Sequence, residues 1–200
     1  EASVEIMGNM GIVLSEEEYA ATVGLRTREC LDFWFRLHDL DLSKAPLTEK
    51  EITSSVISKI KSRGQIMPGV GNIIEFFRSR DFRIGLATSS AMPLVDAVME
   101  RTGLRNAFTV LSSAEHLPFG KPHPQVYLNC AAELQSHPIQ CICFEDSFNG
   151  MIAAKAARMK CVVVPASDVR HELKWNAADV MLHSLEDFNE ETVRKIDLRS

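Results

Sequence analysis

The sequence predicts an α/β fold, in which a doubly wound parallel sheet with a Rossmann-like core is joined to an all-helical domain. Two observations support this prediction. From Met67 onward, short apolar segments rich in Val, Ile, Leu and Cys alternate with stretches of helical periodicity, which is typical of a parallel sheet covered by helices on both faces. Residues 1–66 show helical patterns without a strand signal. We therefore expect two domains, a helical one at 1–66 and an α/β core at 67–200.

Capping residues and apolar spacing support the helices of the first domain. Ser15 is followed by three glutamates, as in an N-cap with an acidic first turn. Apolar residues then recur at near-helical spacing over 28–40 and again over 48–63. We expect Thr48 to cap the second of these helices and Gly64 to end it.

In the second domain, apolar runs mark the strands. Strands are expected at 82–88, 108–114, 141–145 and 161–165, with a weaker one at 179–185. Helices are expected between them, at about 69–80, 91–102, 123–135 and 148–159. In doubly wound folds, ligands bind outside the carboxyl ends of the strands. The chemistry is therefore expected where each strand ends.

Composition excludes several classes of protein. A chain of 200 residues that is 46% hydrophobic can bury one sizeable core and is not disordered. Its net charge of -5 lacks the positive footprint of a nucleic-acid-binding protein. No apolar run reaches the length of a membrane span, and the first residues do not resemble a signal peptide. The five cysteines, an odd number without a CxxC pair, indicate core thiols in a reducing cytoplasm.

Two clusters of polar residues at expected strand ends suit a phosphate group. Thr88, Ser89 and Ser90 precede a helix and offer hydroxyl and amide donors, although an ordinary N-cap has the same residue types. Lys121 follows Gly120 in the segment GKPHP, whose prolines restrict the backbone. There the lysine can present a fixed positive charge, whereas an isolated GKP is more often an exposed loop. We expect His123 to be a loop residue rather than a ligand.

The third cluster is a pair of carboxylates, Glu145 and Asp146, directly after a buried strand. Adjacent acids at such a place repel each other unless a cation offsets their charge. Mg²⁺ fits this role, because it takes carboxylate oxygens and leaves positions for water and substrate. Helix capping by Asp146 or Ser147 is the alternative, but it does not explain two acids. Together the three clusters predict one site for Mg²⁺ and a phosphate ester.

The order LATSS, GKPHPQVY and FEDSFNG resembles motifs two to four of the haloacid dehalogenase-like hydrolase superfamily. Residues 112–134 and 145–166 look like the bacterial hexitol phosphatase and 2-deoxyglucose-6-phosphate phosphatase group, within the β-phosphoglucomutase-like subgroup. This resemblance implies that Thr88 and Ser89 hold the phosphate and that Lys121 bridges phosphate and nucleophile. It also implies that Asp146 ligates Mg²⁺, with Glu145 supporting it directly or through water.

The resemblance further implies that residues 1–66 are a cap that closes over the site and excludes water. Within this cap, Arg26 in the segment GLRTRE is the candidate for recognising the sugar end of the substrate. The alternative is that Arg26 is a solvated arginine at a helix terminus.

Members of this superfamily also carry an early strand that ends in DxDG. Its first aspartate is the nucleophile that becomes an aspartyl-phosphate, and its second is the general acid and base. The D-x-D here, Asp39 to Asp41, ends a helical pattern and is not expected to substitute. We therefore expect both catalytic aspartates to lie N-terminal to residue 1, the printed sequence to be a fragment, and these 200 residues alone to show no turnover.

The function that this resemblance implies is a Mg²⁺-dependent phosphatase of small sugar phosphates, of the hexose, hexitol or 2-deoxyglucose 6-phosphate type. Phosphoryl transfer like that of β-phosphoglucomutase is an open alternative, because it uses the same motifs. A catalytically dead phosphate-binding fragment is a second open alternative. A true dehalogenase is disfavoured, because paired acids that bind Mg²⁺ suit phosphate chemistry. We expect a cytoplasmic monomer or weak homodimer whose partner is a small sugar phosphate, without nucleic acid or membrane.

Overall fold

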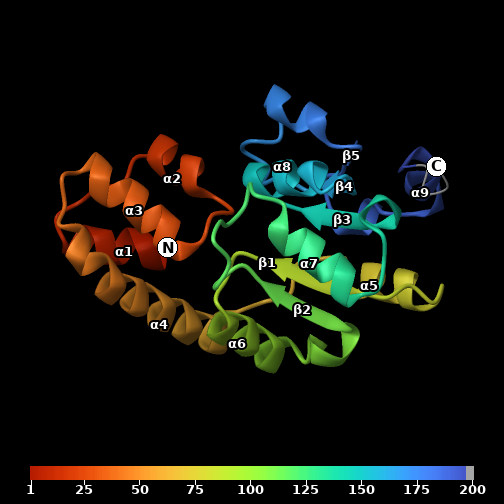
Figure 1. The fold of residues 1–200 in the computed structure, drawn as a ribbon, viewed down its shortest axis with the longest axis horizontal. Coiled ribbons are helices and arrows are strands. Elements are labelled where there is room, and N and C mark those ends of the chain that lie inside the picture. The colour runs from red at the N-terminus through yellow and green to blue at the C-terminus, as the bar shows by residue number, and fades with distance from the viewer. Residues whose placement is uncertain (197–200) are drawn as a thin grey trace.

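A computed structural model describes residues 1–196, so the last four residues of the expected α/β domain lie outside the described part. Four helices gather at one end of the molecule (Figure 1): α1 (Ala2–Asn9), α2 (Glu16–Thr22), α3 (Thr27–Leu37) and α4 (Ala45–Arg63). They enclose a core of their own, in which Met7, Leu31, Trp34 and Phe35 are almost completely buried. The absence of strands over this block was predicted from its periodicity.

Two of the expected helix boundaries are confirmed and one is wrong. Ser15 caps α2 in a reciprocal capping box with Glu18, and Gly64 follows the last residue of α4. Thr48, however, does not begin α4, because the helix starts at Ala45 with a proline in its first turn, a position that proline favours. The Thr48 hydroxyl instead lies inside the helix and donates to the carbonyl of Lys44 at 3.1 Å.

All five expected strands are present, although they are shorter than predicted: β1 (Gly85–Thr88), β2 (Val110–Ser113), β3 (Ile142–Glu145), β4 (Lys160–Val163) and β5 (Val180–Met181). They form two parallel sheets within residues 1–196, β1-β2 and β3-β4-β5. Because β1 and β3 do not pair with each other, each has one edge without a described strand partner.

Helices cover the sheets on both sides: α5 (Val70–Arg78), α6 (Met92–Thr102), α7 (Gln125–Glu133), α8 (Phe148–Ala156) and α9 (Glu190–Ile196). Short 3-10 helices lie in the connections: η1 (Leu42–Lys44) between α3 and α4, and η2 (Leu104–Ala107), η3 (Pro138–Gln140), η4 (Leu173–Ala177) and η5 (Leu185–Asp187) between elements of the α/β part. In β3, Cys143 packs into the cluster formed with α7 and α8, while its neighbour Phe144 packs against Phe77 and Phe188. Since both faces are buried, the strand is apolar at successive positions, and the doubly wound fold is confirmed.

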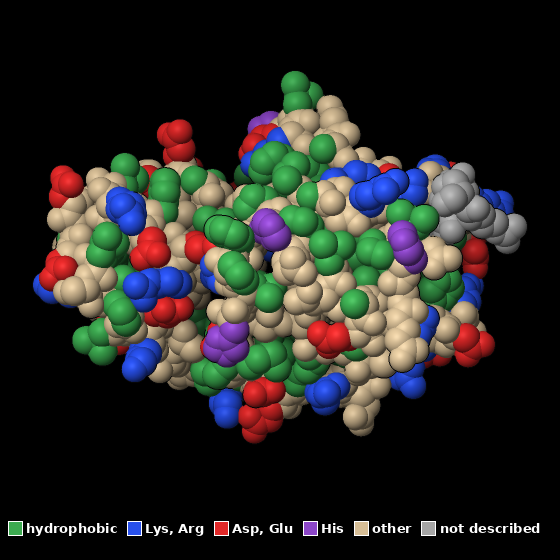
Figure 2. Space-filling view, viewed as in Figure 1, with side chains coloured by type: hydrophobic (Ala, Val, Ile, Leu, Met, Phe, Trp, Pro, Cys, Tyr) green, Lys and Arg blue, Asp and Glu red, His purple; other side chains and the backbone are tan. Residues whose placement is uncertain are grey.

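None of the helices in the described part of the chain is long and apolar enough to cross a bilayer. Figure 2 shows acidic and basic side chains scattered over one face of the molecule rather than gathered into regions of a single sign.

Candidate active site

Lys121 joins the ends of the two sheets. Its side chain is almost fully buried, so it is not an exposed loop lysine. The ammonium nitrogen Nζ donates to Glu145 Oε1 at 2.5 Å and to the carbonyl of Ala87 at 3.1 Å. Ala87 belongs to β1 and Glu145 ends β3. A cation therefore lies at the carboxyl ends of both strands, where the fold predicts a ligand site.

The carboxylate of Glu145 is buried and accepts hydrogen bonds from three side chains. Its Oε1 accepts from Lys121 and from the Tyr127 hydroxyl, and its Oε2 accepts from Ser147 Oγ at 3.1 Å. Ser147 in turn caps α8, because its Oγ accepts from the amide of Gly150 at 3.1 Å. Burial and the charge of Glu145 raise the pKa of Tyr127 well above its ordinary value, so this phenol remains a donor at neutral pH.

The glycine of the FEDSFNG segment, Gly150, lies in close contact with Glu145. A Cβ built at this position would lie 2.0 Å from Glu145 Oε2. Any side chain would therefore displace either the carboxylate or the first turn of α8. The glycine allows the helix backbone to lie directly against the buried acid.

Asp146 differs from its neighbour, because its side chain reaches the surface. Partial burial and the charge of Glu145 raise its pKa above the ordinary value, and none of the ion pairs found in residues 1–196 includes it. Two adjacent carboxylates with too little positive charge suit a hard cation such as Mg²⁺. The described residues contain no group of three or more His, Cys, Asp or Glu that could hold a metal. Asp146 and Glu145 are the two carboxylates of the described residues that could contribute ligands to a cation at this place.

The hydroxyl cluster after β1 does not cap a helix. Thr88 Oγ1 accepts from the amide of Ser90 at 3.0 Å, and Ser89 Oγ donates to the carbonyl of Gly24 at 2.8 Å. The N-cap of α6 is Ala91, and the amide of Met92 donates to Glu115 at 2.9 Å. The carboxylate of Glu115 thus occupies one of the amide donors that the N-terminus of α6 was expected to offer to an anion.

Arg26 is the N-cap residue of α3, and its side chain is only 17% exposed. It is therefore not the solvated arginine that the sequence allowed. Nη1 donates to the carbonyls of Ala114 and Leu117 at 3.2 and 2.6 Å, and Nη2 pairs with Glu29 at 2.7 Å. These donors point to protein acceptors, and recognition of a sugar by Arg26 stays a prediction.

The segment between α2 and α3 lies on the loops that carry the candidate site. Gly24 has a φ of +89°, and a Cβ there would lie 2.5 Å from Ser147 Oγ. Next to it, the carbonyl of Val23 accepts from Asn149 Nδ2 at 2.9 Å. Both a left-handed backbone and a close approach therefore require glycine at this position.

The Asp39 to Asp41 segment is structural. Asp39 follows α3 with a φ of 50°, and Asp41 caps η1 by accepting from the amide of Ser43 at 2.9 Å. A carboxylate that caps a turn of the helical end is not at the carboxyl end of a strand.

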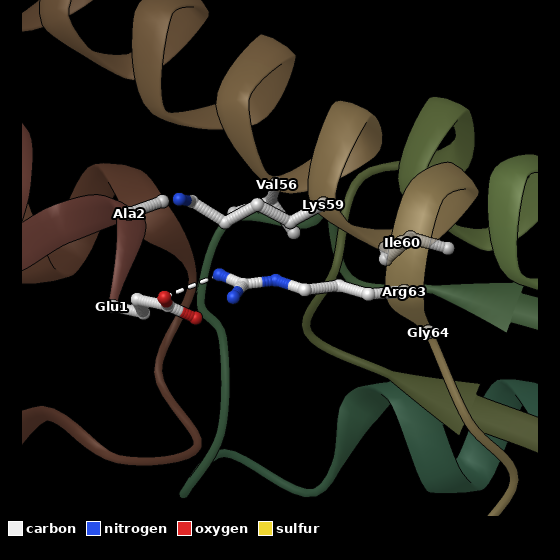
Figure 3. Close-up of a pocket in the computed structure, with 7 residues that line it drawn as sticks. All are labelled: Glu1, Ala2, Val56, Lys59, Ile60, Arg63 and Gly64. Carbon is white, nitrogen blue, oxygen red and sulfur yellow. Dashed lines mark hydrogen bonds and ion pairs between the residues drawn. The ribbon is translucent and has the colours of Figure 1, made fainter.

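The surface cavities include one at the candidate site and one away from it. One, of about 610 Å³, is lined by Lys121 and its neighbours together with Leu25 and Glu29, so it is part of the candidate site. The other, of about 530 Å³, lies between the start of α1 and the end of α4. Figure 3 shows Arg63 reaching across this second cavity to Glu1. No residue that we assigned to the site lines it.

Three residues of the site were missed from the sequence: Tyr127, Ser147 as a partner of Glu145, and Glu29. Tyr127 could have been noticed, since a tyrosine on a buried helix face needs a partner for its hydroxyl. Glu29 gave no such signal, because its partner Gly120 lies 91 positions away in the chain.

Comparison with known proteins gives a consistent result. A family model described as haloacid dehalogenase-like hydrolase matches residues 5–158. Hexitol phosphatase B of Escherichia coli (strain K12) is 36% identical over 185 residues, which are 92% of this chain and 83% of that protein. Fructose-1-phosphate phosphatase YqaB of the same organism is 29% identical over 160 residues, which are 80% of this chain and 84% of that protein.

Solved structures agree with the fold. β-Phosphoglucomutase from Clostridium difficile superposes with a TM-score of 0.83 at 22% identity, covering 98% of this chain and 87% of that one. CbbY from Rhodobacter sphaeroides in complex with phosphate gives a TM-score of 0.80 at 26% identity, covering 93% and 86%. The likeness to the first of these structures shows a shared fold.

Proposed function

Because the chain belongs to the haloacid dehalogenase-like hydrolase family and is a phosphoric monoester hydrolase, we propose that it is a Mg²⁺-dependent phosphatase of small sugar phosphates. The hexose, hexitol and 2-deoxyglucose 6-phosphates are the substrate types that we favour. The observation that carries the proposal is the junction of Lys121 with Glu145 at the ends of β1 and β3. The names of the two phosphatases above, one of hexitol and one of fructose 1-phosphate, support the sugar.

In this proposal Thr88, Ser89 and Lys121 bind the phosphate group. Lys121 already lies buried at the strand ends with its charge held by three oxygen acceptors, from Ala87, Tyr127 and Glu145. A buried and fixed ammonium stabilises the charge that develops on a phosphoryl group more effectively than a solvated one. Thr88 is the last residue of β1 and Ser89 follows it, and the carbonyl of Ala87 in the same strand is one of these acceptors.

Mg²⁺ would be held by Asp146, with Glu145 supporting it directly or through water. When bound, the cation would neutralise phosphate oxygens and screen the two carboxylates from each other. Lys121, Tyr127 and Ser147 hold the carboxylate of Glu145 in a fixed orientation. Asp146, exposed beside it, is free to take a ligand.

The aspartyl-phosphate intermediate of the proposed mechanism needs a nucleophile and a general acid and base. Asp39 and Asp41 belong to the helical end, so we place both catalytic aspartates in a segment N-terminal to residue 1. The edges of β1 and β3 that have no described strand partner support this placement, since one further strand between them would complete the sheet.

Three further parts of the proposal concern the helical end and the state of the protein. We propose that residues 1–66 act as the cap domain and that residues 67–200 form the catalytic core. The contacts of Gly24 with the loops after β1 and β3 support a covering role. We also propose that the protein is a cytoplasmic monomer or weak homodimer that acts on small molecules.

The experiment is product analysis with full-length protein and a panel of sugar phosphates. Inorganic phosphate is measured by colorimetry and the organic phosphates by ³¹P NMR, with Mg²⁺ and with a chelator. We expect release of inorganic phosphate from at least one 6-phosphate, and loss of this release with the chelator. An isomerised sugar phosphate without free phosphate would identify a mutase instead. Binding without any product would identify a catalytically dead protein.

A further inference from the structure

The Arg26–Glu29 pair holds the start of α3 against the loop that leads to Lys121. Glu29 Oε1 accepts from Arg26 Nη2 at 2.7 Å and from the amide of Gly120 at 3.0 Å. Its Oε2 accepts from the amide of Arg26 at 3.1 Å. One carboxylate therefore caps the helix and binds the residue that precedes Lys121.

Arg26 secures the same loop at its beginning. Its Nη1 donates to the carbonyls of Ala114 and Leu117, the latter at 2.6 Å. The pair thus contacts both ends of residues 114–120, the loop that connects β2 to Lys121. Hydrogen bonds between charged side chains and backbone groups are the stronger kind, and they fix direction as well as distance.

Gly120 fits this contact closely. A Cβ built on it would lie 2.3 Å from Glu29 Oε2 and 2.9 Å from Arg26 Nε. The pair therefore lies directly on the backbone of Gly120, one residue before the lysine. A side chain at this position would push the pair away from the loop.

We propose that Glu29 is a positioning residue for the phosphatase reaction: paired with Arg26, it holds Gly120 and thereby sets the place of the Lys121 ammonium group. Because Glu29 belongs to α3 of the helical end, the contact also makes the position of Lys121 depend on that end being seated on the core. The reaction part of this inference rests on the proposed function. Glu29 acts through the backbone of Gly120 and not on the substrate.

The test compares Glu29→Ala, Gly120→Ala and the double variant in the full-length protein. Displacing a phosphoryl-binding charge by a fraction of an ångström lowers kcat by about tenfold to a hundredfold, while a loosened loop changes KM by less than about threefold. Gly120→Ala, introduced alone, should lower kcat by a similar factor. In the Glu29→Ala background it should have less than about a threefold effect, because the nearest obstacle has been removed.

A second readout does not depend on catalysis. We expect amide hydrogen exchange at Gly120 to be at least about tenfold faster in Glu29→Ala, with the exchange of β4 amides unchanged. The matched control is Asp32→Ala on the same helix, which removes an exposed ion pair with Arg28 and should leave kcat and Gly120 exchange within about twofold of wild type.

The outcomes separate the two proposals. A kcat within about twofold of wild type in Glu29→Ala, or a double variant whose loss equals the product of the single losses, overturns the positioning role. If the wild-type protein releases phosphate from no sugar phosphate, the proposed function fails. Amide hydrogen exchange at Gly120 then still tests whether Glu29 holds this residue. Unchanged exchange in Glu29→Ala then overturns the inference on its own.

Discussion

The ammonium nitrogen of Lys121 lies 2.5 Å from Glu145 Oε1, and both side chains are more than nine-tenths buried. Lys121 also binds the carbonyl of Ala87, so one side chain links β1 to the end of β3, two strands that share no ladder hydrogen bonds. A buried ion pair stabilises a fold only when further hydrogen bonds satisfy its members. Here Tyr127 and Ser147 supply them.

Lys121→Ala should damage both function and stability. Loss of one charged contact to the phosphoryl group costs at least about 2 kcal/mol of transition-state stabilisation, roughly thirtyfold in kcat/KM. The variant also leaves the Glu145 carboxylate buried without its cation, which lowers the free energy of unfolding by about 3 kcal/mol. Kinetics of phosphate release and urea unfolding measure these effects. Lys195→Ala, which removes an exposed pair with Glu191, is the control, and a loss below about twofold for Lys121→Ala would contradict the assignment.

Asp146→Asn should abolish Mg²⁺-dependent hydrolysis without weakening the fold. Partial burial and the charge of Glu145 raise the pKa of Asp146, so the ionised carboxylate is less favourable in the folded protein than in the unfolded chain. A neutral amide removes this unfavourable charge but is a poorer Mg²⁺ ligand. Urea unfolding in the presence of a chelator should therefore give an equal or higher free energy of unfolding. Retained activity, or a clear loss of stability, would show that Asp146 has another role.

Gly150→Ala should disrupt the site, because the new Cβ would lie 2.0 Å from Glu145 Oε2. We expect loss of activity and a destabilisation of about 2 kcal/mol or more. Gly71 is the matched control, since it lies in α5 with nothing within 4 Å of its Cβ position. There the same substitution should leave activity unchanged and stabilise the protein by up to about 1 kcal/mol. Similar thermal midpoints for the two variants would refute the close approach at Gly150.

Glu29 should make stability depend on pH. Burial raises the pKa of Glu29, but hydrogen bonds from Arg26 and Gly120 outweigh it, and the pKa lies below its ordinary value. A lowered carboxyl pKa contributes stability that is present above the unfolded-state pKa and is lost as pH falls through the folded-state pKa. The advantage of wild type over Glu29→Gln in urea unfolding should therefore shrink between about pH 6 and about pH 3. The same difference in the free energy of unfolding between wild type and Glu29→Gln at both pH values would contradict this prediction.

Much of the core could be predicted from local pattern. The strands ending at Thr88 and Glu145 were found because parallel strands buried on both faces read as continuous apolar runs. Ser15 and Gly64 were found because capping depends on residues within one helical turn. Thr48 was misplaced for a related reason, since Pro46, two residues earlier, lies in the first turn of the same helix.

The candidate site was only partly predictable. Lys121, Glu145 and Asp146 were identified at strand ends, but their partners were not. Tyr127 joins the ion pair because α7 turns its hydroxyl inward. Recognition of the sugar by Arg26 stays a prediction, and its hydrogen bonds to the carbonyls of the loop before Lys121 could not be predicted.

The order of helices and strands, the family, and the residue types at the strand ends could be predicted from the chain alone, because periodicity, capping and motif spacing act over a few positions. Which of these groups meet depends on the folded structure. Lys121 binds Ala87 across 34 positions and Arg26 binds Leu117 across 91. Such pairings have no local signature, since they result from the packing of helices against sheets, and it is packing that places one charge within hydrogen-bonding distance of another.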